Sequence, residues 1–190
     1  MIKVDKKIAI RKITFSALFL ALALIVSVLE NMIPPLIPVL PYAKIGLCNI
    51  VLLMCFLLVG VWEGYIVLVI KCVLAAVFAG NMGMLIWSLP AALISYSVMV
   101  GLYYARIFST TAISVAGGLI HNMVQMFVGA IVVGTSILTF MPYMMLAGGI
   151  AGLITGILCH VLVETLKDKI NPPAPVEQED VVQDNLDSNS

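Results

Sequence analysis

The sequence predicts an all-α protein, a polytopic transmembrane bundle of six helices. Hydrophobic residues make up 62% of the 190-residue chain and charged residues only 11%, whereas a soluble domain carries about 25% charged residues. The mean hydropathy is +1.14. A soluble core of this size cannot hide so much apolar surface, so we expect lipid to be the solvent.

Six apolar segments have about the length that a helix needs to cross a bilayer, roughly 20 residues. The first follows a basic start and is too long for the apolar region of a cleaved signal peptide. The second and third are short and meet at residues 60–64, a Gly-Val-Trp-Glu-Gly sequence typical of a membrane interface. The predicted spans are residues 11–29, 45–61, 64–80, 84–104, 113–134 and 141–163.

Charge divides the chain into a basic N-terminus (1–12), a transmembrane domain (13–165) and an acidic, proline-containing tail (166–190) that we expect to be disordered. The tail could also serve as an acidic docking segment. Basic residues favour the cytoplasmic side of membrane proteins. With the N-terminus inside, Lys44 alone lies outside, so we expect a cell-membrane protein with both termini cytoplasmic. The inner basic residues would be Lys3, Lys6, Lys7, Arg11, Lys12, Arg106, Lys167 and Lys169.

The external connection, residues 30–44, is apolar but contains four prolines, which exclude a regular helix. It would be either a lid or re-entrant piece, or a rigid interfacial linker. Residues 46–49 and 118–122 each lead into an apolar run that ends at a glycine. This short similarity between the two halves of the chain would fit a 3+3 inverted repeat with a binding site between the halves.

Lys71 lies near the middle of the third span, about 10–13 Å from either helix end. Charged side chains in a membrane are costly and usually functional. We therefore favour an ammonium that binds a carboxylate or phosphate of a ligand. The alternative is a structural pair with Glu30 or Glu63.

The fifth span carries a polar stripe of His121, Asn122 and Gln125, bordered by Gly118 and Gly129. The spacing of three and four residues places them on one helical face. They would either line a ligand pocket, with Asn49 of the second span as a partner, or hold helices together by hydrogen bonds.

Small residues at a spacing of four predict close helix packing. Gly148, Gly152 and Gly156 form such a ridge on the last span, and Ala17 and Ala21 form a weaker one on the first.

Two other polar features have structural explanations. His160 precedes Glu164 by one turn, which predicts an ion pair at the inner end of the last span. The four cysteines lack metal-ligand spacing, so we expect buried free thiols at Cys48, Cys55, Cys72 and Cys159.

Motifs for catalysis are missing from the sequence. It has no Walker A loop, HExxH or GxSxG motif. Adjacent acids, which could hold magnesium diphosphate, occur only at Glu179-Asp180 in the tail. We therefore expect no catalytic residue and no metal site, and the sparse charge of the middle speaks against a nucleic-acid surface.

Residues 44–51, Lys-Ile-Gly-Leu-Cys-Asn-Ile-Val, are similar to a K-L-G-L-A-N-I-V motif, and residues 114–125 fit S-V-A-G-(x)₃-H-N-(x)₂-Q. Both motifs, with the turn at 146–149, resemble the Gx transporter family, also labelled heptaprenyl diphosphate synthase component I. The resemblance covers roughly residues 13–165. Lys44, which opens the first motif, joins the candidate ligand-binding residues. Lys71 stands where we associate an arginine with the family, which weakens an argument for bidentate phosphate contacts.

The resemblance implies two roles. The six-span outline is similar to the substrate-binding S components of ECF-type vitamin transporters, in which the Ala17 and Ala21 face would meet an energising transporter module. The synthase label instead implies a non-catalytic membrane subunit beside a soluble prenyl diphosphate synthase. A third interpretation is a membrane scaffold of a redox assembly, with flavin or quinone held non-covalently. We favour a transport subunit for a small anionic or vitamin- or flavin-like molecule, because the spans offer a polar pocket but no carboxylates for magnesium.

Overall fold

The computed structural model describes residues 6–32 and 46–170 of the chain, without the side chains of residues 6, 7, 31 and 166–170. This part contains six α-helices, one 3₁₀ helix and no strand. The helices are α1 (Lys6–Met32), α2 (Asn49–Leu58), α3 (Val61–Phe78), α4 (Met84–Tyr104), α5 (Thr110–Val133), η1 (Thr135–Phe140) and α6 (Met141–Ile170). The predicted all-α bundle of six helices is confirmed.

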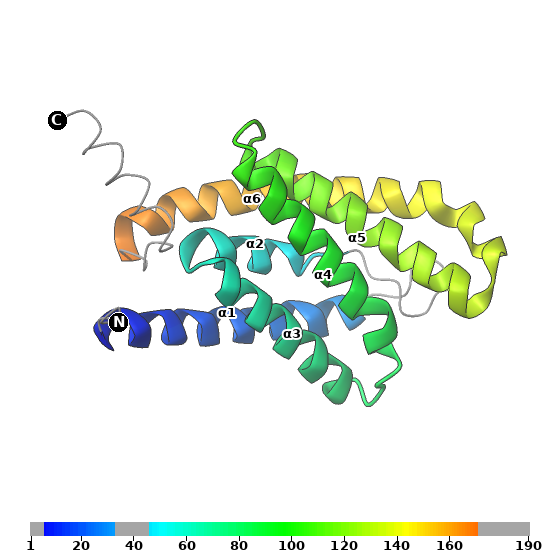
Figure 1. The fold of residues 1–190 in the computed structure, drawn as a ribbon, viewed down its shortest axis with the longest axis horizontal. Helices are drawn as coiled ribbons and strands as arrows, with labels where there is room; N and C mark the ends of the chain where they lie inside the picture. Colours follow the sequence, from blue (N-terminus) through cyan, green and yellow to red (C-terminus); the bar gives the residue numbers. More distant parts are fainter. Residues whose placement is uncertain (1–5, 33–45, 171–190) are drawn as a thin grey trace.

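Five helices, all except α2, have the length and hydropathy to cross a membrane. Large apolar side chains such as Ile13, Trp62, Ile131 and Leu146 are exposed on their outer surfaces. Water would penalise so much exposed apolar surface, whereas lipid does not. The chain is therefore a multi-pass membrane protein. The start of α1 and the end of α6 lie at the same end of the bundle (Figure 1).

Helix α2 differs from the prediction of a full span over residues 45–61. Its ten residues extend about 15 Å, half of the roughly 30 Å hydrocarbon core. It contacts each of the other α-helices, and all its residues except Leu57 are buried. It is thus the central helix of the bundle (Figure 1). A half-length helix is tolerated in a membrane because surrounding protein covers its ends.

Glycines set both ends of this central element. Gly46 has φ +88° in the turn that precedes α2, and Gly60 has φ +151° in the short connection to α3. Side chains disfavour both conformations.

Helix α5 begins earlier than predicted. The Ser109 side chain accepts a hydrogen bond from the Ala112 amide at 3.2 Å and caps the helix.

The glycine ridge of α6 packs against α5, as predicted. A Cβ on Gly152 would lie 2.7 Å from Val115 Cα, and one on Gly156 would lie 2.9 Å from Thr111 Cα. Such close backbone approach requires glycine. The predicted inverted repeat would pair α2 with α5, which differ in length at 10 and 24 residues, and it stays a prediction.

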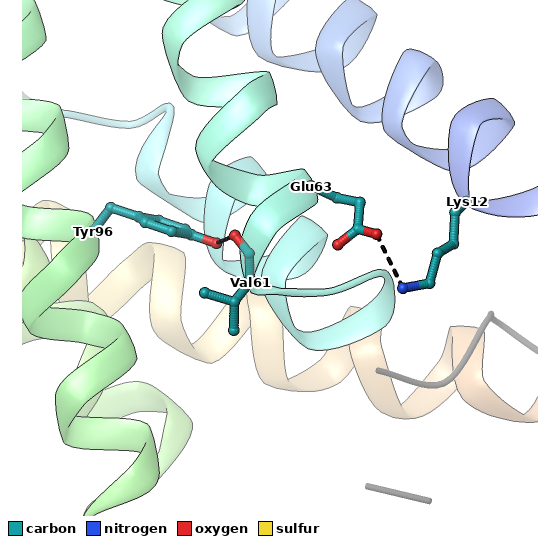
Figure 2. A network of polar contacts seen from close by, with 4 residues as sticks. All are labelled: Lys12, Val61, Glu63 and Tyr96. Atoms are coloured by element: carbon teal, nitrogen blue, oxygen red, sulfur yellow. Dashed lines mark hydrogen bonds and ion pairs between the residues drawn. The ribbon is translucent and has the colours of Figure 1, made fainter. Parts of the chain in front are cut away.

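A second set of contacts ties α3 to its neighbours near its N-terminus (Figure 2). Lys12 of α1 and Glu63 of α3 form an ion pair of 3.0 Å. The Tyr96 hydroxyl of α4 donates a hydrogen bond to the Val61 carbonyl at 2.9 Å.

In the C-terminal part of α6, His160 and Glu164 lie 3.6 Å apart, as predicted.

Candidate functional site

The turn at residues 46–48, which leads into α2, is held by an acid from α1. Glu30 Oε1 accepts hydrogen bonds from the Gly46 amide at 2.6 Å and from the Leu47 amide at 3.4 Å. Only 6% of the Glu30 surface is exposed. A carboxylate at this position accepts hydrogen bonds from amides that precede the helix. Its negative charge is also stabilised by the positive N-terminal end of the helix dipole.

Lys71 approaches the same turn from α3. Its ammonium lies close enough to Cys48 and Glu30 for both side chains to act on its charge. Cys48 in turn donates to the Ala23 carbonyl of α1 at 3.5 Å. Of the two acids considered from the sequence, Glu30 is therefore the one near Lys71, since Glu63 is paired with Lys12.

The polar face of α5 reaches this turn through His121. The His121 Nε2 and Gln125 Nε2 atoms lie 3.1 Å apart within the helix. A Cβ on Gly46 would lie 3.4 Å from His121 Cδ2 and 3.3 Å from Asn49 Nδ2. His121 and Asn49 thus flank Gly46, and the two motifs of the sequence meet there. We call Glu30, Cys48, Asn49, Lys71, His121 and Gln125 the polar centre.

Asn122 lies beside His121 in the chain but faces α6. Its Nδ2 donates to the Met144 carbonyl at 2.7 Å, and a Cβ on Gly148 would lie 2.5 Å from the same atom. The predicted polar stripe is therefore divided: His121 approaches the turn before α2, whereas Asn122 joins α5 to α6. Ser114 and Thr155 make a further link between these two helices, at 3.0 Å.

Several buried polar atoms in this region have no hydrogen-bond partner among the described residues. They are Asn49 Nδ2, Asn122 Oδ1 and, on α1, Ser27 Oγ. All three residues are at least 96% buried. Buried polar groups are nearly always satisfied, so such groups call for an explanation. Sequence reasoning missed Ser27, although its spacing one turn before Glu30 was available as a signal.

The remaining candidate residues lie elsewhere. Lys44 falls outside the described residues. Ala17 and Ala21 are exposed on α1, whereas Gly148, Gly152 and Gly156 are used within the bundle. The four cysteines are buried free thiols, as predicted. Among the described residues no cluster of three His, Cys, Asp or Glu could hold a metal ion.

An apolar groove of about 500 Å³ lies between α5 and α6, apart from the polar centre. Leu146, Ile150 and Leu153 line it and are exposed on the outer surface of the bundle. Its lining is apolar throughout, which suits the lipid chains that surround a transmembrane helix.

Fold and site define a multi-pass helical membrane protein with charged and amide side chains buried around a short central helix. The chain belongs to the heptaprenyl diphosphate synthase component I family, which matches residues 19–162. This match confirms the resemblance seen in the sequence under its synthase-component name, while the link to transporters stays a prediction. No curated protein and no solved structure matches the chain.

Proposed function

We propose that the chain is a membrane-embedded binding subunit, similar in role to transporter S components, that holds a small polar molecule at the polar centre. The observation that carries this proposal is the buried carboxamide nitrogen of Asn49 beside Gly46 and His121, which has no hydrogen-bond partner in the described part of the chain. Burying a hydrogen-bonding group without a partner costs about 1–3 kcal/mol. A ligand that bonds to this group would remove the cost.

The location supports the same function. The polar centre lies where α1, α2, α3 and α5 meet, at the buried start of a half-length helix. Interrupted or short helices with polar ends in the protein interior are typical of binding sites in transporters. The eight basic residues assigned to the inner side, and the shared end of α1 and α6 in Figure 1, support cytoplasmic termini. The exposed Ala17 and Ala21 would then be available to an energising partner in the membrane.

Ligand-induced thermal stabilisation tests this function. We expect one or more compounds of a small-molecule library to raise the apparent melting temperature of the purified chain. At a hundredfold excess over Kd, a ligand stabilises by about 2.7 kcal/mol. Lys71→Met and Asn49→Leu should lose the shift, whereas the matched controls Lys12→Met and Asn81→Leu should keep it. A shift retained in both site variants would contradict the proposed site.

The family name favours a second candidate, a non-catalytic membrane subunit of a prenyl diphosphate synthase. The spans lack paired carboxylates for magnesium diphosphate, so catalysis would belong to a soluble partner. In this case the purified chain should raise prenyl diphosphate output by a soluble catalytic subunit. Unchanged output in lipid nanodiscs would contradict this candidate and leave the first one standing.

A further inference from the structure

The fixed charges of the polar centre balance each other. Glu30 and Lys71 are the only buried carboxylate and ammonium among the described side chains, with 6% and 8% of their surfaces exposed. They have opposite charge and approach the same turn before α2, Glu30 at the Gly46 amide and Lys71 near Cys48. Other described acids lie elsewhere: Glu63 pairs with Lys12 and Glu164 with His160.

Glu30 also occupies the position that an anionic ligand would seek. The amides that precede a helix bind anions, but here the Gly46 and Leu47 amides already donate to Glu30 Oε1. An incoming carboxylate or phosphate would have to displace Glu30 or lie next to its charge. Either arrangement is costly in a buried site, where like charges are poorly screened.

One group of the polar centre that lacks a partner among the described residues is uncharged. Asn49 is a carboxamide that is 4% exposed, and its Nδ2 has no hydrogen-bond partner within residues 6–32 and 46–170. A carboxamide pairs well with another amide, an imide or a hydroxyl group, because each offers donors and acceptors of matching strength.

We propose that the polar centre selects an uncharged polar molecule with an amide, imide or hydroxyl group that pairs with Asn49, and that it discriminates against anionic forms of that molecule. This inference rests on the proposed function and departs from the anionic ligand that Lys71 alone suggests. Lys71 and Glu30 then position the turn around the ligand and supply no net charge to it.

Matched pairs of compounds that differ by one anionic group test this selectivity. The full chain in lipid nanodiscs is titrated with nicotinamide and nicotinate, with uracil and orotate, and with riboflavin and riboflavin 5′-phosphate. In a pair that binds, the neutral member should bind about tenfold or more tightly, which corresponds to about 1.4 kcal/mol. Equal or tighter binding of the anionic member would overturn the inference while leaving the proposed function intact. If none of these compounds binds, the result would count against both this inference and the proposed function.

Charge variants show whether Glu30 and Lys71 set this selectivity. Glu30→Gln leaves the Lys71 charge unbalanced, so the ratio of affinities should move toward the anionic compound by about tenfold. The double variant Glu30→Gln/Lys71→Gln restores neutrality and should return the ratio to the wild-type value. If Glu30→Gln does not fold, Lys71→Gln alone should shift the ratio of affinities further in favour of the neutral compound. A ratio that stays unchanged in the variants that fold would overturn the inference.

Discussion

Glu30 Oε1 of α1 lies 2.6 Å from the backbone nitrogen of Gly46, sixteen residues further along the chain. This contact fixes the start of the central helix α2 to the end of α1. Because Gly46 also lies against Asn49 and His121, the same contact positions the polar centre.

Glu30→Leu should therefore destabilise the protein more than Glu30→Gln. The leucine leaves the Gly46 and Leu47 amides without an acceptor, at about 1–3 kcal/mol each, and leaves Lys71 as a buried charge without its counter-charge. The glutamine keeps an acceptor oxygen. Apparent melting temperatures of the purified variants measure the difference. Equal temperatures for the two variants would show that Glu30 does not anchor the turn.

Gly152→Ala should disrupt the contact between α5 and α6. The added Cβ would lie 2.7 Å from Val115 Cα and 2.9 Å from the Ser114 carbonyl oxygen, and backbone atoms cannot move aside cheaply. We expect a loss of about 1–3 kcal/mol. Gly149→Ala, on the same helix, is the matched control, since its Cβ would meet Leu119 at an ordinary 3.5 Å. Unfolding in denaturant compares the two, and similar losses would argue against tight packing at Gly152.

Gly64→Ala should force α3 away from α4, because the new Cβ would overlap the Tyr96 hydroxyl. This hydroxyl donates to the Val61 carbonyl (Figure 2), so the substitution should cost about 1–3 kcal/mol. In a Tyr96→Phe background the penalty of Gly64→Ala should fall in part, because the overlapping oxygen is gone while the ring carbon Cζ would still lie 2.6 Å from the new Cβ. Gly101→Ala, which meets nothing within 4 Å, serves as the control in α4. An undiminished penalty in the Phe background would contradict the contact.

Labelling of introduced cysteines tests the orientation. Met82 and Ile107 are exposed, in the connections that follow α3 and α4 respectively. Met82→Cys should react with a membrane-impermeant maleimide in intact cells, and Ile107→Cys only after permeabilisation. The four native cysteines are buried and should give little background. The opposite pattern would place the termini outside.

The sequence predicted the all-α bundle because long apolar segments mark membrane helices whatever their neighbours are. The predicted helix boundaries were less accurate at helix ends that are not set by a change in hydropathy. Helix α6 continues to Ile170, beyond the predicted residue 163, because an exposed helix can extend past the apolar core. Helix α2 is shorter than predicted because Gly46 turns the chain within an apolar segment, and hydropathy does not distinguish a buried turn from a helix.

Residue type predicted which polar side chains lie near the turn better than it predicted their partners, and their role as a binding site stays a prediction. Lys71, Asn49 and His121 were chosen because polar groups are costly in lipid, and the structure brings them to one turn. Their arrangement depends on tertiary contacts that spacing does not contain. Glu30 reaches the Gly46 amide only because α1 packs along α2, and Asn122 turns to Met144 because the glycines of α6 let the two helices approach.

Mass spectrometry of small molecules retained by the gently purified protein is the decisive test for a ligand at the polar centre. We expect a single uncharged polar compound in near-stoichiometric amount with the wild-type chain. Asn49→Leu should lose this compound, and Asn81→Leu should keep it. A compound retained equally by wild type and Asn49→Leu, or no retained compound at all, would contradict a ligand at the polar centre.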